Sequence, residues 1–94
     1  IMRAASDHLI PVNLELGGKD AMIVLSDADL DYATSAALWG GFSNSGQICA
    51  SVERIIVHES IAEKFKAGLR DKLATLRQGH SRDGDNDLGA ITFE

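Results

Sequence analysis

Two short, unbroken apolar runs, each followed by a segment of helical periodicity, constrain the fold of this chain more than any other feature. The first run covers residues 21–25, and the second forms the centre of residues 52–58. Apolar runs of this length without polar alternation are typical of strands buried on both faces of a parallel sheet. Strands that alternate with helices imply α/β layering. We therefore expect an α/β fold with a mostly parallel sheet.

Both expected helices carry an apolar stripe and a recognisable start. Residues 26–29 (Ser-Asp-Ala-Asp) offer side-chain acceptors and negative charge at a helix start, and the helix is expected to fade near residues 43–46. Residues 60–63 (Ser-Ile-Ala-Glu) have the pattern of a capping box for a second helix, closed by Gly79. The stripes are Leu30, Ala33, Ala37, Leu38, Gly41 and Phe42 in the first helix, and Ile61, Phe65, Leu69, Leu73 and Leu76 in the second.

A further strand is expected over residues 12–16, where apolar residues alternate with Asn13 and Glu15. Glu15 would then point away from the buried face. Gly17 and Gly18 interrupt the pattern, as a turn or a close backbone approach would. The expected order is thus strand, strand, helix, strand, helix, followed by a polar loop at residues 80–87. In parallel sheets the chemistry tends to lie in loops beyond the strand ends, and Glu15 and Cys49 each occupy such a loop.

Charge and composition exclude several classes of function. The 94 residues carry a net charge of −5, which disfavours nucleic acid as a partner. No apolar stretch approaches the roughly 20 residues of a membrane span, and no secretory leader is visible. A single cysteine fits a reducing, cytoplasmic location. The three histidines and the alternating aspartates of residues 83–87 lack the spacing of a metal site.

Taken singly, Cys49 and Glu15 leave both inert and functional interpretations open. Small neighbours (Gly46, Ala50 and Ser51) would give a Cys49 nucleophile access, yet free cysteines are also among the most buried and inert residues. Glu15 is costly inside an apolar segment unless it is paired or functional. Burial would make it a usable base near neutral pH, whereas exposure at a sheet edge would leave it without a role.

The longer pattern resembles a known family. Leu14-Glu15-Leu16-Gly17-Gly18-Lys19 is followed, 34 residues after the glutamate, by the cysteine of Gly46-Gln47-Ile48-Cys49. Together with segments 27–31 and 57–60, this arrangement closely resembles the aldehyde dehydrogenase superfamily. The resemblance implies that residues 1–94 are part of a three-layer α/β/α catalytic domain. The family's dinucleotide-binding domain is absent from this sequence, and more chain is expected on both sides.

The same resemblance implies roles for three residues. Cys49 would attack an aldehyde, and its backbone N–H would supply part of the oxyanion hole. Glu15 would activate the water that hydrolyses the resulting thioester, since relatives that transfer the acyl group to coenzyme A tend to lack this glutamate. Leu16 would approach the nicotinamide of NAD or NADP, and no metal is implied.

Two other interpretations stay open beside the enzyme. These residues could form a catalytically silent structural or assembly piece, or Cys49 could act alone as a redox-active thiol. Even under the enzymatic interpretation, the 94 residues are expected to be inactive by themselves. The full-length enzyme is expected to be a homo-oligomer, and the exposed sheet edges of a cut domain also favour self-association.

Overall fold

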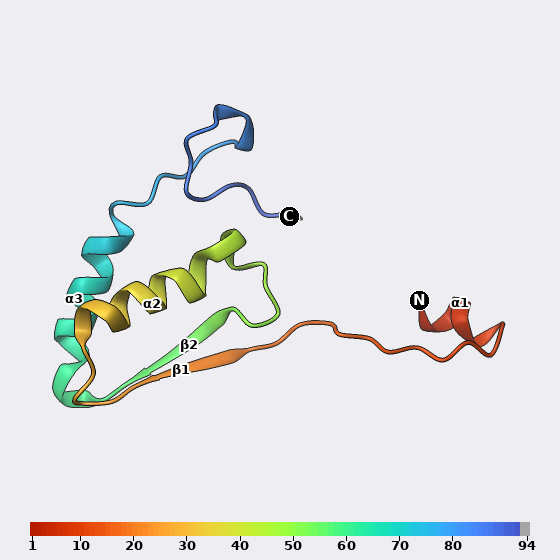
Figure 1. The fold of residues 1–94 in the computed structure, drawn as a ribbon, viewed down its shortest axis with the longest axis horizontal. Helices are drawn as coiled ribbons and strands as arrows, with labels where there is room; N and C mark the ends of the chain where they lie inside the picture. The colour runs from red at the N-terminus through yellow and green to blue at the C-terminus, as the bar shows by residue number, and fades with distance from the viewer. Residues whose placement is uncertain (93–94) are drawn as a thin grey trace.

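The computed structural model describes residues 1–92 and contains a parallel pair of strands with two helices on one face (Figure 1). The α/β class and the parallel pairing are therefore confirmed. The main elements follow one another as β1 (Asp20–Val24), α2 (Leu30–Phe42), β2 (Val52–Val57) and α3 (Ala62–Leu73). Shorter pieces are α1 (Met2–Ser6) and the 3₁₀ turns η1 (Ser43–Gly46), η2 (Glu59–Ile61) and η3 (Ser81–Asp83).

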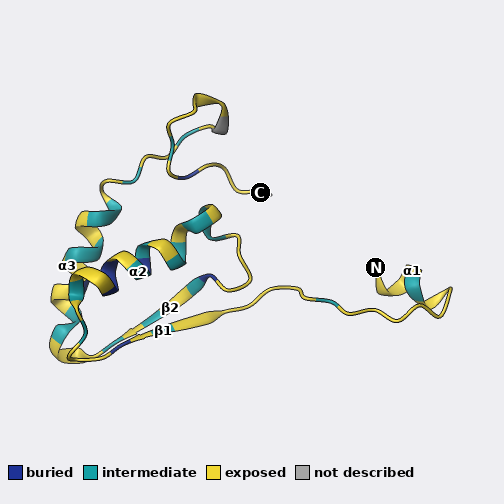
Figure 2. Cartoon of the chain, in the orientation of Figure 1, coloured by how far each residue is buried: buried dark blue, intermediate teal, exposed yellow. Residues whose placement is uncertain are grey.

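A small apolar core joins the helices to the strand pair. Its buried members are Val24 of β1, Ala33 and Ala37 of α2, and Phe65 of α3, each at most 5% exposed. Phe65 is the largest of these side chains, and its burial contributes about 1.5–3 kcal/mol. The two small alanines let α2 lie close to both α3 and the sheet. Figure 2 shows how few residues are fully buried, and they lie mainly on α2 and the strands.

The face of the strand pair that points away from the helices is open. Ile23 of β1 and Ile56 of β2 are register partners, and they remain 66% and 55% exposed. Burial on both faces, as expected from the sequence, is therefore wrong for the described residues. The described residues form two layers, the helices and the sheet, and the third layer of the expected α/β/α arrangement is not among them.

The strand expected over residues 12–16 does not form. Residues 10–19 run without regular structure as an arm that leads away from the body (Figure 1). Leu16, which the expected strand would bury, is 84% exposed. The radius of gyration is 18.0 Å, against about 12 Å for a compact domain of this length. Alternation specifies the faces of a strand but cannot provide the partner strand whose hydrogen bonds hold it.

Helix α2 begins where the sequence predicts, whereas the start of α3 is set by a residue outside the predicted capping box. At α2, Asp29 is the N-cap as predicted, and its carboxylate accepts hydrogen bonds from the backbone N–H groups of Asp31 and Tyr32 at 3.0 and 3.1 Å. The capping box at residues 60–63 does not form, because His58 Nδ1 accepts from the Ser60 backbone N–H and begins η2 instead. Helix α3 also ends at Leu73, before Gly79. No helix within residues 1–92 is long and apolar enough to span a bilayer.

Arg77 organises the polar loop near the C-terminus. The Asp87 carboxylate accepts from the backbone N–H and the guanidinium of Arg77 at 3.0 and 3.2 Å, and Asp85 pairs with the same guanidinium at 2.5 Å. The hydrogen bond to Asp87 raises the pKa of Arg77, and the hydrogen bond from the Arg77 side chain lowers the pKa of Asp87. Two of the three alternating aspartates are thus partners of an arginine. No cluster of three potential metal ligands occurs within residues 1–92.

Because the folded loop lowers the pKa of Asp87, we expect this carboxyl to titrate below the ordinary aspartate value of 3.8. A lowered folded pKa means that the carboxylate stabilises the loop fully at higher pH and loses its contribution as the pH falls through the folded pKa. An NMR titration of the side-chain carboxyl measures this midpoint. Arg77→Met should return it toward 3.8, and an equal midpoint in both proteins would contradict the assignment.

Candidate active site

The parallel pairing of β1 with β2 brings the two motifs found in the sequence to the same edge of the sheet. Gly18 lies two residues before β1, and Cys49 lies three residues before β2. A Cβ atom at Gly18 would overlap the Cys49 carbonyl oxygen, so the two backbones are in direct contact. The close approach expected at the glycine pair is therefore confirmed. It lies where the strands begin, at the amino-terminal edge of the pair.

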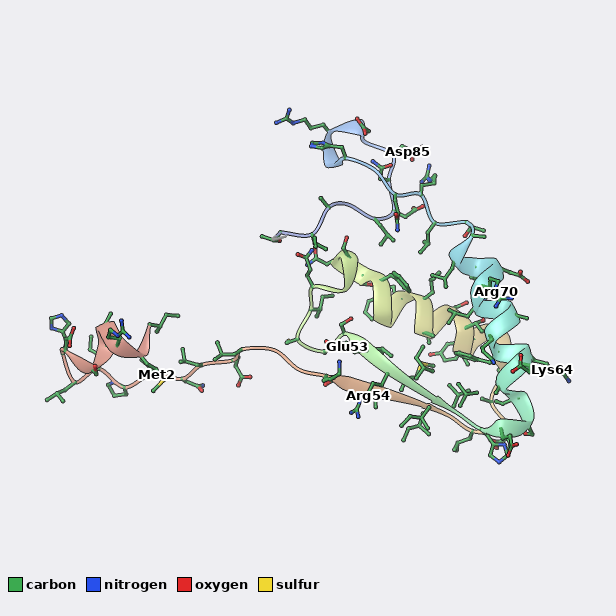
Figure 3. All side chains as sticks on the ribbon, turned by 180° about the vertical axis from the view of Figure 1, so that it is seen from behind. Met2, Glu53, Arg54, Lys64, Arg70 and Asp85 are labelled. Atoms are coloured by element: carbon green, nitrogen blue, oxygen red, sulfur yellow. The ribbon has the colours of Figure 1, made fainter. Side chains whose placement is uncertain are left out.

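An irregularity in the strand pairing adjoins this contact. Asp20 pairs with Val52, whereas Ala21 pairs with Arg54, which leaves Glu53 as an extra residue on β2. Glu53 binds Lys19 Nζ at 2.5 Å, and Arg54 donates to the Lys19 carbonyl oxygen at 3.2 Å. Figure 3 shows Glu53 and Arg54 beside the start of the strand pair. Bulges often redirect side chains next to active sites. Here the two residues at the bulge in β2 both bind Lys19, so they connect the start of β2 to the residue just before β1.

Cys49 is carried on a tight turn that keeps its thiol exposed. The Ser51 backbone N–H donates to the Ile48 carbonyl at 3.0 Å, which places Cys49 second in a four-residue turn. Ser51 itself is 3% exposed, and its hydroxyl donates to the Gly40 carbonyl of α2 at 3.2 Å. Among the described residues, no group accepts a hydrogen bond from the Cys49 backbone N–H. The turn therefore offers an accessible sulfur together with a free backbone donor.

The three residues Asn44, Ser45 and Gly46, which approach this turn, have consecutive positive φ angles of 51°, 58° and 76°. Left-handed backbone costs about 1–2 kcal/mol at a non-glycine residue, and it persists only where surrounding contacts hold it. At Gly46 a Cβ would lie 3.2 Å from the Gly41 carbonyl oxygen, which adds a steric reason for glycine. The loop before Cys49 therefore has a strained backbone that surrounding contacts hold in one conformation.

Glu15 and Leu16 lie on the exposed arm just before the contact at Gly18. No hydrogen bond joins Glu15 to Cys49 within residues 1–92. Three peptide units join Glu15 to Gly18, so the Cα atoms of these two residues are at most about 11 Å apart. The apolar enclosure that would desolvate the Glu15 carboxylate is not provided by the described part of the chain.

The arm has features that suit a nicotinamide ring. Leu16 presents an 84% exposed apolar side chain, and Gly17 has a φ of 128° with nothing within 4 Å of the place where a Cβ would be. A planar ring can lie against an exposed leucine and an open glycine backbone. These residues could therefore contact the nicotinamide of NAD or NADP, whereas the described residues include no glycine-rich loop for its phosphates.

Comparison with known proteins identifies the class. All 94 residues match the aldehyde dehydrogenase family, and the chain belongs to that family. It is 53% identical over 92 residues to the 4,4'-diapolycopene aldehyde oxidase of Methylomonas sp., which covers 98% of this chain and 17% of that protein. It is 49% identical over 84 residues to the vanillin dehydrogenase of Pseudomonas fluorescens, which covers 89% of this chain and 17% of the relative.

A solved structure agrees with the fold. The betaine aldehyde dehydrogenase of Staphylococcus aureus, crystallised with NAD⁺, superimposes with a TM-score of 0.82 at 37% identity. The match covers 96% of this chain and 18% of that one. The chain thus spans about a sixth of the length of the relatives it matches.

The residues that hold the Cys49 loop in place are not predictable from the sequence pattern. The polar and small residues 43–46 indicate only the fading end of a helix. The Ser51 hydroxyl is held by a hydrogen bond to α2, whereas the left-handed residues 44–46 are held by hydrogen bonds of Asn44, Ser45 and Gln47. The one available signal is the dense run Ser-Asn-Ser-Gly-Gln between an amphipathic helix and an apolar run.

We expect Gly18→Ala to lower the free energy of unfolding by about 1–3 kcal/mol, because the added methyl group forces the Gly18 and Cys49 backbones apart. Gly89→Ala is the matched control, since nothing lies within 4 Å of the place where its Cβ would be, and its effect should stay within about 0.5 kcal/mol. Urea unfolding of the full-length protein measures both values. Equal effects of the two substitutions would contradict the contact.

Proposed function

We propose that this chain is the part of an NAD(P)-dependent aldehyde dehydrogenase that carries the nucleophile, Cys49, and the general base, Glu15. The observation that carries the proposal is the backbone contact between Gly18 and Cys49. It brings the glutamate segment to the cysteine turn at one edge of the sheet. Membership of the aldehyde dehydrogenase family supports the same chemistry.

In the proposed first step, the Cys49 thiolate attacks the carbonyl carbon of an aldehyde. A carbon–sulfur bond forms, and the carbonyl oxygen becomes the alkoxide of a thiohemiacetal. The Cys49 backbone N–H, which has no acceptor among the described residues, is available to donate to this oxygen. A thiolate is an intrinsically strong nucleophile, and covalent capture divides the oxidation into two easier steps.

The remaining steps oxidise the thiohemiacetal to a thioester and then release a carboxylic acid. A bound nicotinamide would supply the hydride acceptor, and oxidation of the thiohemiacetal carbon would leave a thioester on Cys49. Glu15 takes a proton from a water molecule, and the resulting hydroxide attacks the thioester carbon. The carbon–sulfur bond then breaks, which regenerates the thiolate. Leu16 and Gly17 contribute an apolar surface against which the nicotinamide can lie.

The proposal concerns the full-length enzyme, because the described residues of this chain do not enclose an active site. Glu15, Leu16 and Cys49 are all exposed, and we propose that other parts of the enzyme, including a dinucleotide-binding domain, cover them. The 94 residues alone should therefore be inactive. We further propose a cytoplasmic homo-oligomer that acts on a small-molecule aldehyde, since a reactive thiol must stay reduced. The relatives are named for different aldehydes, so they support the class of substrate and not one compound.

Cys49→Ala should lower aldehyde-dependent NAD(P)H formation by about a thousandfold or more, because no thiohemiacetal can form without the sulfur. The full-length enzyme is assayed by absorbance at the reduced nicotinamide band, and acylation of the protein is followed by mass spectrometry. Both signals should disappear together. Dehydrogenase activity that survives the substitution would exclude Cys49 as the nucleophile.

Glu15→Gln should preserve the first burst of NAD(P)H but slow steady-state turnover by about 10²–10⁴-fold, because the amide cannot deprotonate water. The acyl-enzyme should then accumulate and be visible by mass spectrometry. Glu59→Gln provides the matched control, since it makes the same change at an exposed carboxylate in η2. Steady-state turnover equal to that control would remove Glu15 from the mechanism.

A further inference from the structure

Gln47 lies between the strained loop and the Cys49 turn. Its side-chain amide forms one hydrogen bond within the loop and one to a segment far away in the sequence. Its Nε2 donates to the Asn44 carbonyl at 3.1 Å, while Asn44 Nδ2 donates back to the Gln47 carbonyl at the same distance. The Gln47 backbone N–H also donates to the Asn44 carbonyl, at 3.1 Å. Three hydrogen bonds thus close the loop between these two residues.

The other end of the same amide reaches a distant segment. Gln47 Oε1 accepts from the Thr92 backbone N–H at 2.7 Å, a contact that joins residues 45 positions apart. A second bond joins the same two regions, from the Ser45 hydroxyl to the Gly89 carbonyl at 3.0 Å. The loop before Cys49 is therefore attached to residues 89–92 at two points. Within residues 1–92, Gln47 is the side chain that takes part in both the internal closure and the attachment.

These bonds explain how the left-handed backbone of residues 44–46 is maintained. Strained backbone relaxes unless neighbouring contacts over-determine it. On the side of β2, the buried Ser51 hydroxyl holds the turn to α2. On the other side, the closure at Asn44 and the attachment to Thr92 provide the constraint. Cys49 lies between the two anchors, two residues after Gln47.

From this placement we propose that Gln47 is a positioning residue for the Cys49 nucleophile, an inference that rests on the proposed function. It touches neither substrate nor cofactor in the proposed mechanism. It sets the course of the backbone that aims the Cys49 sulfur and the Cys49 N–H at the aldehyde. Displacing a reacting group by about 1 Å costs roughly a hundredfold in rate.

The test compares three variants of the full-length enzyme. Gln47→Met keeps the length of the side chain but removes both bonds of the amide. Gln47→Glu keeps an oxygen acceptor for the Thr92 N–H and loses the donor to Asn44. Gln78→Met makes the same glutamine-to-methionine change at an exposed side chain that forms no hydrogen bond within residues 1–92, and so serves as the matched control.

We expect Gln47→Met to lower the single-turnover rate of hydride formation by about tenfold to a hundredfold, with an unchanged burst amplitude and a rate of Cys49 alkylation by iodoacetamide close to that of the control. Gln47→Glu should recover part of the rate. Three results would overturn the proposal: a rate equal to that of Gln78→Met, a loss seen only as fewer reactive sites at an unchanged rate, or no recovery in Gln47→Glu.

Hydrogen exchange separates this inference from the proposed function. Amides of residues 44–49 should exchange faster in Gln47→Met than in Gln78→Met, whether or not the protein oxidises aldehydes. If the wild-type enzyme shows no aldehyde-dependent hydride formation, the proposed function fails, and faster exchange still supports the positioning of the Cys49 backbone by Gln47. Equal exchange in the two variants would overturn the positioning role by itself.

Discussion

The parallel register of β1 and β2 is the constraint on which the rest of this structure depends. Because the strands run in the same direction and begin side by side, the segments that lead into them must meet at one edge. Gly18 and Cys49 therefore come into backbone contact although about thirty residues separate them. Helix α2 is the crossover that makes this pairing possible, since parallel strands need a long connection. The proposed catalytic geometry follows from that pairing.

The loop between α2 and β2 shows how a small fold holds the proposed nucleophile at a defined place. Its backbone is left-handed at Asn44, Ser45 and Gly46, so local preference opposes the native conformation. Polar contacts offset this opposition at both ends, through Ser51 to α2 and through Gln47 to Thr92. The apolar core contributes little near this loop, because it lies between the strand pair and the two helices. The backbone conformation of the Cys49 turn thus depends on hydrogen bonds more than on apolar packing.

Local signals in the sequence predict those elements whose stability comes from nearby residues. The helix start at Asp29 is predictable because its carboxylate acts within three residues. The apolar stripes of the two helices likewise contain the observed core residues Ala33, Ala37 and Phe65. The strand predicted at residues 12–16 is wrong, since a strand needs a partner that alternation cannot supply. The capping box predicted at residues 60–63 is wrong as well, because His58 satisfies the Ser60 N–H first.

By itself, the sequence determined the α/β class and the two motifs that mark the aldehyde dehydrogenase family. These depend on residue type and spacing, which the chain carries wherever it folds. Only the tertiary structure decided that Gly18 lies against the Cys49 carbonyl, and that Gln47 ties the cysteine loop to Thr92. Such contacts join residues far apart in the chain, and their geometry depends on the strand register and on the path of α2. No local pattern of residues specifies either.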